Sequence, residues 1–255
     1  MRVSAAMLAT LALALAGPAL AASPFANWAT VVVAGDWHAH SGGPSEAFDN
    51  ARRDVTAALQ GAGFDSRNLR QFSVRPERYK DAHPGKSDIQ AIYDGIDEVA
   101  SKATGGCLIY FSSHGAPQGV VIDQQILLPA VLATMLDHSC GARPTVVIIS
   151  ACFSGVFVPA LAKPNRMILT AARPDRTSFG CGEADKYPYF DDCFLSSIPG
   201  AHDFIALAHA VQSCVAAREI REGVKPPSEP QLFVGGGLKA ILPLYALTAP
   251  SAGGN

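Results

Sequence analysis

Two segments decide the fold of this chain: Leu108-Ile-Tyr-Phe-Ser-Ser-His114-Gly115 and Val146-Val-Ile-Ile-Ser-Ala-Cys152-Phe-Ser-Gly155. Each is an apolar run rich in β-branched or aromatic residues, which is typical of a buried strand, and each stops at a reactive side chain. One run delivers a histidine and the other a cysteine. Because a thiol needs a nearby base to become a nucleophilic thiolate, and histidine is the usual base, the pair predicts a cysteine hydrolase.

Apolar runs alternate with helical periodicity along the rest of the chain. Strands are expected at 30–34, 69–74, 107–111, 145–149, 166–170 and 231–234. Helices are expected from Pro44, from a capping box formed by Ser87 and Gln90, and around 128–136 and 204–215. This alternation predicts an α/β fold with a mostly parallel, six-stranded sheet sandwiched by helices.

The order of these elements brings the histidine and the cysteine together. The strand before His114, the next helix and the strand before Cys152 form one β-α-β unit, whose right-handed crossover makes the two strands parallel. Neighbouring strands lie about 5 Å apart. We therefore expect both side chains at the carboxyl edge of the sheet, where the active sites of open parallel sheets lie.

Composition excludes some classes of function. The chain has 255 residues, is 49% hydrophobic and 16% charged, and carries a net charge of −2. This length and apolar content suit one large domain with a well-filled core. The small net charge and the lack of a basic stripe argue against nucleic-acid binding.

The N-terminus has the pattern of a bacterial secretory signal. Arg2 supplies the positive charge, an apolar run over 5–16 is too short to span a bilayer, and Ala19-Leu20-Ala21 fits a cleavage site. We expect a signal peptide over 1–21, a peptidase domain over 22–248 and a disordered tail over 249–255. The mature chain contains no later apolar segment that could span a membrane, so we expect a periplasmic or secreted protein.

The chain contains six cysteines: Cys107, Cys140, Cys152, Cys181, Cys193 and Cys214. Disulfides persist in an exported protein, and keeping Cys152 as a thiol leaves an odd number, so at least one more cysteine must be unpaired. Cys181 and Cys193 flank a polar loop and are the predicted bridge. Cys107 begins an apolar strand and is predicted to be a buried free thiol. Because no Cys-x-x-Cys pair occurs, a zinc ribbon is disfavoured.

A loop of polar residues follows the first predicted strand. His38 and His40 could share a metal ion, but no third candidate ligand lies near them in the sequence, which favours a flexible loop lining the active-site cleft. Asp36 and Asp49 lie near the same edge of the sheet. Either carboxylate could orient His114, and the sequence does not choose between them.

Three blocks together resemble a known family. They are Tyr110-Phe-Ser-Ser-His114-Gly115, Ser150-Ala-Cys152-Phe-Ser-Gly155 and Thr170-Ala-Ala-Arg-Pro-Asp-Arg-Thr-Ser178-Phe-Gly. In order and spacing they are similar to the legumain-type peptidases, which include the asparaginyl endopeptidases and the catalytic subunit of GPI transamidase. The resemblance extends from Val31 to about Val234. It implies a caspase-like fold and a cysteine endopeptidase that needs no metal or organic cofactor.

The resemblance also implies roles for individual residues. Cys152 is the nucleophile, and His114 is the general base and then the acid that protonates the leaving amine. The backbone N–H groups of Gly115 and Cys152 form the oxyanion hole, which stabilises the developing negative charge. The acyl-enzyme is hydrolysed by water, or transferred to another peptide if an amine replaces water.

The substrate pocket departs from the family pattern. Family members that cut after Asn hold the amide with an Arg, an acid two residues before the nucleophile, and a later Asp. Here Asn50 stands at the position of the Arg, and Ser150 stands at the position of the acid two residues before the nucleophile. Thr177 and Ser178 match the pocket wall. The later acid is Asp191 or Asp192. With Asp49, Asp191 or Asp192 at its floor, the pocket is predicted to favour a basic residue instead.

Two other readings compete with the peptidase. A catalytically silent caspase-fold protein would bind peptides in the same cleft without turnover, and the altered pocket favours it while the intact His114 and Cys152 argue against it. A thiol-based redox protein would need a resolving cysteine near Cys152, and its own loop contains none. The expected partner is therefore a peptide or protein substrate.

Overall fold

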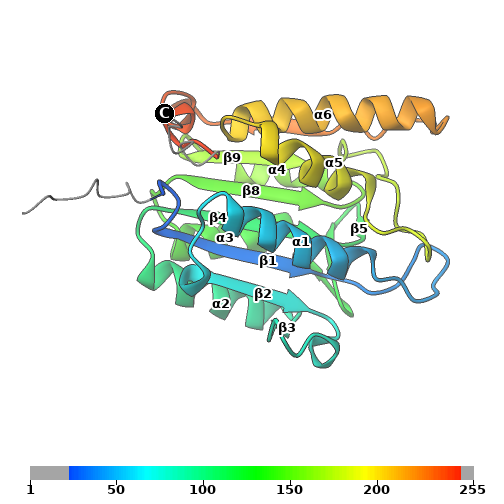
Figure 1. Ribbon diagram of the computed structural model, residues 1–255, viewed down its shortest axis with the longest axis horizontal. Helices are drawn as coiled ribbons and strands as arrows, with labels where there is room; N and C mark the ends of the chain where they lie inside the picture. The colour runs from blue at the N-terminus through cyan, green and yellow to red at the C-terminus, as the bar shows by residue number, and fades with distance from the viewer. Residues whose placement is uncertain (1–22, 248–255) are drawn as a thin grey trace, which may run out of the picture.

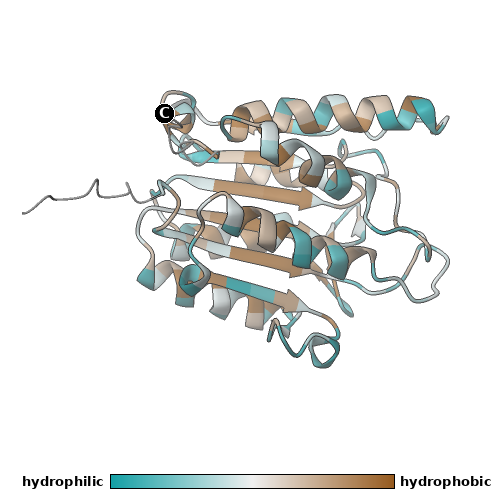
Figure 2. Cartoon of the chain, in the orientation of Figure 1, coloured by the Kyte–Doolittle hydropathy of each residue, from teal (hydrophilic) through white to brown (hydrophobic). Residues whose placement is uncertain are grey.

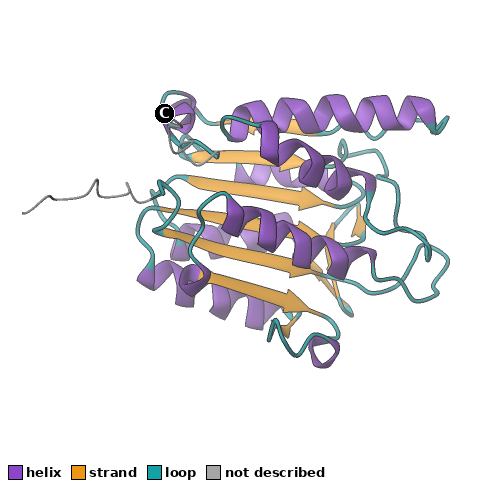
Figure 3. Cartoon of the chain, viewed as in Figure 1, coloured by secondary structure: helices purple, strands orange, loops and turns teal. Residues whose placement is uncertain are grey.

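The computed structural model describes residues 23–247, so the expected signal peptide and C-terminal tail lie outside the described residues. A central sheet has the strand order β10-β9-β8-β4-β1-β2-β3 and is covered by helices on both faces (Figures 1 and 3). Its strands are β1 (Trp28–Ala34), β2 (Leu69–Ser73), β3 (Gly85–Lys86), β4 (Gly106–Ser112), β8 (Thr145–Ser150), β9 (Arg166–Thr170) and β10 (Gln231–Val234). All neighbouring pairs are parallel except β10 with β9, which is antiparallel.

The helices divide between the two faces of the sheet. They are α1 (Ala47–Gly61), α2 (Ile89–Lys102), α3 (Pro129–Ser139), α4 (Phe157–Leu161), α5 (Tyr189–Ser197), α6 (Phe204–Arg221) and α7 (Gly236–Lys239). The side chains of α1, α5 and α6 share one apolar core with alternate strand residues such as Tyr110 and Ile148. Those of α2, α3 and α4 share a second core with the intervening residues, such as Ile109 and Ile149.

This two-sided burial explains the strand sequences. β1, β4 and β8 are buried at every position, so both alternating faces are apolar and the strands read as continuous hydrophobic runs (Figure 2). The predicted mostly parallel α/β sheet is confirmed, but it has seven strands rather than six. The additional strand, β3, is a two-residue edge strand paired with β2 and carries no apolar pattern.

A second, three-stranded sheet follows His114. It consists of β5 (Gly115–Ala116), β6 (Gly119–Ile122) and β7 (Gln125–Leu127). This sheet was not predicted from the sequence because its strands are short. The N-cap of α2 also differs from the predicted capping box, since Asp88 accepts hydrogen bonds from the N–H groups of Gln90 and Ala91. Ser87 instead donates to the carbonyl of Ala34 at 2.7 Å.

Two disulfides fix elements around the sheet. One joins Cys107 at the start of β4 to Cys140 just after α3, and the other joins Cys193 on α5 to Cys214 on α6. The predicted Cys181–Cys193 bridge and the predicted free thiol of Cys107 are therefore wrong. Cys193 is buried in the core next to α6, whereas Cys181 lies in the loop before α5, so sequence proximity did not select the partner.

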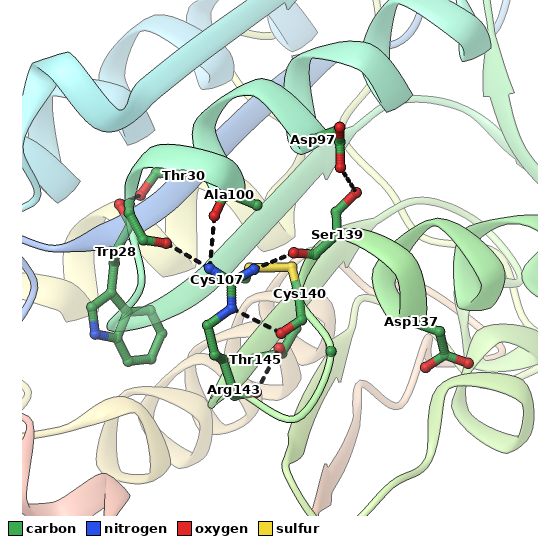
Figure 4. Close-up of a disulfide and its surroundings, with 12 residues drawn as sticks. Trp28, Thr30, Asp97, Ala100, Cys107, Asp137, Ser139, Cys140, Arg143 and Thr145 are labelled. Carbon is green, nitrogen blue, oxygen red and sulfur yellow. Dashed lines mark hydrogen bonds between the residues drawn. A yellow bond between two sulfur atoms is a disulfide. The ribbon is translucent and has the colours of Figure 1, made fainter.

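The first disulfide lies beside Arg143, whose guanidinium group donates hydrogen bonds to several backbone carbonyl oxygens. Arg143 donates to the carbonyl oxygens of Ala100, Ala103 and Ser139, and its Nε donates to that of Cys140 (Figure 4). These carbonyls lie at the ends of α2 and α3, where the helices leave backbone acceptors without partners of their own. Arg143 and the disulfide therefore hold the two helix ends to the amino end of β4.

Candidate active site

Strand register brings His114 and Cys152 to the same level of the sheet. β4 and β8 are parallel neighbours in which Ser112 is paired with Ser150. His114 follows Ser112 by two residues, and Cys152 follows Ser150 by two residues. Both therefore leave the carboxyl edge of the sheet together, and both line one cavity of about 570 Å³. In this structure the thiol and the imidazole face the same cavity without a hydrogen bond between them.

A backbone carbonyl orients the imidazole of His114. Its Nε2 atom lies 2.9 Å from the carbonyl oxygen of His38, and its ring meets that of Phe48 edge to face at 4.9 Å between centroids. A carbonyl oxygen can only accept a hydrogen bond, so Nε2 must carry the proton. In the neutral ring Nδ1 is then left with its lone pair, which is the state required of a general base.

Asp36 holds the loop that supplies this carbonyl. Its Oδ1 atom accepts hydrogen bonds from the N–H groups of Trp37 at 2.6 Å and His38 at 3.0 Å. The same atom lies 2.7 Å from Nδ1 of His38. Asp36 thus acts on His114 only through the loop. Asp49, the other acid considered for this role, instead pairs with Arg52 at 2.8 Å and accepts a hydrogen bond from Ser73.

The thiol of Cys152 lies against the backbone of Ser178. The Ser178 N–H donates to Sγ at 3.3 Å, and Sγ lies 3.5 Å from the Ser178 carbonyl oxygen. The next residue, Phe153, has a φ of 57°, and its N–H donates to the carbonyl of Arg176. This left-handed conformation of a bulky residue beside the nucleophile is the kind of local strain found at functional sites.

Gly115 is required by the close approach of two backbones. A Cβ atom built on Gly115 would lie 1.9 Å from the carbonyl oxygen of Cys152, so no side chain fits. Gly115 and Cys152 both line the cavity. Their N–H groups, the predicted oxyanion donors, are thus carried by two backbone segments in contact with one another.

The predicted substrate-binding residues fall into two groups. Thr177 and Ser178 line the cavity. The other predicted residues, Ser150, Asn50, Asp191 and Asp192, do not line it. The Nδ2 group of Asn50 donates to the carbonyl of Lys186, and Asp192 pairs with Arg218.

Asp191 lies in the protein interior below the strand ends. It is completely buried and accepts hydrogen bonds from the hydroxyl groups of Tyr110 at 2.6 Å, Ser112 at 2.9 Å and Ser150 at 2.7 Å. Burial raises the pKa of Asp191 to about 6, although the three hydroxyl donors oppose the shift. The same burial, reinforced by the neighbouring carboxylate, raises the pKa of Tyr110 well above its ordinary value. Asp191 thus ties β4, β8 and α5 together rather than meeting a substrate.

Two side chains that were not predicted to belong to the site also line the cavity. Asp185 and Cys181 both come from the loop between β9 and α5. Cys181 is a free thiol whose pKa burial raises to about 11, with further contributions from Cys152 and Asp185. The loop has no periodicity that indicates which of its polar side chains turn inward. The only available signal was the series of small residues around Gly180 and Gly182.

The His38–His40 segment contributes to the site without forming a metal centre. His40 lines the cavity, while the ring of His38 contacts Asp36. Within residues 23–247, no group of three or more His, Cys, Asp or Glu side chains is arranged to hold a metal ion. The helices in that same part of the chain are also too short or too polar to cross a membrane.

The caspase-like fold and the family match together define the class of a caspase-fold cysteine peptidase. The model of the Peptidase C13 family matches residues 62–214, and the chain belongs to this family. The crystal structure of caspase-1 from Spodoptera frugiperda is similar in fold, with a TM-score of 0.60 and 14% identity. That match covers 89% of this chain and 94% of the caspase chain. No curated protein sequence matches the chain.

Proposed function

We propose that the chain is an exported cysteine endopeptidase that uses Cys152 as nucleophile and His114 as general base. One observation carries the proposal: the pairing of Ser112 with Ser150 sends His114 and Cys152 from equivalent positions of adjacent parallel strands into one cavity. A structural cysteine would have no need of a histidine at the matching position or of an opening to the surface. Membership of the Peptidase C13 family supports the same chemistry.

The proposed reaction uses these groups in sequence. The Nδ1 atom of His114 takes the proton of the Cys152 thiol, and the thiolate attacks the carbonyl carbon of the scissile peptide bond. The N–H groups of Gly115 and Cys152 stabilise the resulting oxyanion. The protonated imidazole returns the proton to the leaving amine as the C–N bond breaks, which leaves a thioester on Cys152.

Release of the acyl group needs a second nucleophile. A water molecule, deprotonated by His114, attacks the thioester and releases the acid product together with the thiolate. If the amine of another peptide enters the cavity first, the same attack forms a new peptide bond. Transpeptidation is thus a side reaction available to the same intermediate.

Export to the periplasm or the medium is supported by the cysteines as well as by the N-terminal sequence. Four of the six cysteines form disulfides between secondary-structure elements. Disulfides of this structural kind persist in oxidising compartments and are rare in the cytosol. A bacterial source agrees with the short, alanine-rich N-terminal run.

The test is cleavage of fluorogenic peptides that differ only in the residue on the acyl side of the scissile bond. The mature protein is assayed under mild reduction beside Cys152→Ala. We expect turnover by the wild type and a loss of at least about 10³-fold in the variant, because the substitution removes the proposed nucleophile. Equal thermal unfolding of both proteins would show that the variant is folded.

A peptide-binding protein without turnover is the second candidate. It is favoured by the contacts of the Cys152 thiol with Ser178 in place of His114. Peptides that protect Cys152 from alkylation, but are cleaved by neither protein, would establish this candidate and exclude the peptidase.

A further inference from the structure

The cavity has apolar walls and an acidic side chain. Phe153, Phe179 and Gly180 contribute apolar surface, and Asp185 contributes the carboxylate. Within residues 23–247, no lysine or arginine lines this cavity. An acidic substrate side chain would therefore find no lysine or arginine to pair with there, whereas a long basic side chain would find apolar walls for its stem and a carboxylate for its head.

Asp185 differs from the other acids near the site in having unused hydrogen-bonding capacity. Asp191 is surrounded by three hydroxyl donors, Asp192 is paired with Arg218, and Asp49 is paired with Arg52. Asp185 accepts one hydrogen bond, from the N–H of Gly182 to Oδ2 at 2.7 Å. Within the described part of the chain it has no ion-pair partner, so its Oδ1 atom is available to a ligand.

The charge of Asp185 is directed toward the cavity. Asp185 is one of the groups that raise the pKa of the Cys181 thiol, and both side chains line the cavity together with Cys152. The hydrogen bond from Gly182 also fixes the carboxylate, because it closes a tight turn in which the Asp185 N–H lies 3.3 Å from the Gly182 carbonyl. A fixed carboxylate loses little conformational freedom when it binds a cation.

We propose that Asp185 is a specificity-determining residue that selects lysine or arginine next to the scissile bond on the acyl side. The proposal rests on the peptidase function proposed above and names its substrate class. The side chain of that residue lies along Phe153 and Phe179, and its ammonium or guanidinium group contacts Asp185. The acid that favours a basic residue is therefore Asp185, and not one of the three acids predicted from the sequence.

The test compares five peptides that differ only at that residue: lysine, arginine, norleucine, asparagine and aspartate. Norleucine keeps the stem of lysine without its charge, so the ratio of kcat/KM for lysine over norleucine measures recognition of the charge. We expect this ratio to be about 10 to 100 in the wild type, which is the usual strength of a hydrogen bond to a charged partner. The aspartate peptide should be the poorest substrate.

Two matched variants separate the contact from a change in folding. Asp185→Asn removes the charge but keeps an oxygen that can accept the Gly182 N–H, and we expect the ratio to fall close to one. Glu183→Gln removes a charge two residues away, on an exposed side chain that accepts a hydrogen bond from Ser41 outside the cavity. This control should leave the ratio unchanged.

A binding readout distinguishes failure of the proposal from failure of the peptidase function. Peptide amides are tested for protection of Cys152 against iodoacetamide, measured by mass spectrometry. Better protection by the lysine peptide than by norleucine, lost in Asp185→Asn, would support the role of Asp185 even if no bond were cleaved. Equal protection and equal cleavage of the two peptides by the wild type would overturn it while leaving the peptidase intact. An unchanged ratio in Asp185→Asn would also overturn it.

Discussion

The Nε2 atom of His114 lies 2.9 Å from the backbone carbonyl oxygen of His38. The orienting group of the candidate base is thus a peptide carbonyl on the loop after β1, and not a carboxylate. A neutral acceptor fixes the tautomer without adding negative charge beside the imidazole. The position of the base consequently depends on the conformation of that loop, which Asp36 stabilises through three contacts to one oxygen atom.

Replacement of Asp36 should therefore affect catalysis without touching the reacting groups. We expect Asp36→Ala to lower kcat about 10- to 100-fold with little change in KM, because the carbonyl of His38 loses its fixed position. Asp36→Asn keeps an Oδ1 acceptor for the two N–H groups and should retain most of the activity. Steady-state kinetics of the pair, with the pH profile of kcat, checks this. Equal loss in both variants would mean that the charge, and not the loop geometry, matters.

Gly115 offers a steric test of the oxyanion site. Gly115→Ala places a methyl group where the Cys152 carbonyl oxygen already lies, so the two strand ends must separate. We expect a loss of kcat/KM of about 10²-fold or more, which is the usual effect of losing one oxyanion donor. Gly61→Ala, at the end of α1, meets nothing within 4 Å and should be neutral or slightly stabilising. Full activity in Gly115→Ala would exclude this backbone from the site.

Asp191 should make stability fall as pH rises. Its pKa is about 6 in the folded protein and near 4 when unfolded, so the folded state binds more protons between these values. The free energy of unfolding then decreases from pH 4 to pH 6, by at most about 3 kcal/mol from this group. Asp191→Asn removes the effect. Urea unfolding of both proteins at several pH values should show the wild type losing stability relative to the variant over this window, and a constant difference would contradict it.

The disulfide pattern predicts which thiols react. With the unreduced protein unfolded in denaturant, alkylation should label two cysteines, Cys152 and Cys181. Prior reduction should raise the number to six, the total in the chain. Peptide mapping by mass spectrometry identifies the labelled residues. Labelling of Cys107 or Cys193 without reduction would contradict the two disulfides of the structure.

The central part of the fold could be predicted from the sequence because its signal is local. β4 and β8 are buried on both faces, so their apolar runs are continuous, and the β-α-β rule then fixes the relation of His114 to Cys152. β3, β5 and β7 were not predicted, because strands of two or three residues carry too few side chains to show a period, and β6 has four residues of which the first is a glycine.

The substrate pocket was less predictable for a different reason. Whether an acid in the loop before α5 or in the first turn of α5 faces the cavity or the interior depends on tertiary contacts. Asp191 is drawn inward by hydroxyl groups from β4 and β8, whereas Asp185 is turned by a hydrogen bond within its own loop. Neither contact leaves a spacing pattern. The prediction of the disulfide pairing was wrong for a similar reason, since Cys193 meets Cys214 through the packing of α5 on α6.

The Cys107–Cys140 disulfide lies at the amino end of β4, while His114 follows its carboxyl end. Because β4 has seven residues, the disulfide at one end of the strand lies roughly 20 Å from His114 at the other end. Thiol–disulfide exchange requires direct attack of a thiolate on sulfur, so the native sheet keeps the reactive thiol of Cys152 away from this bridge. The unfolded chain has no such separation. Oxidative refolding should therefore produce scrambled disulfide isomers, whereas the folded protein is protected from shuffling this bridge by its own architecture.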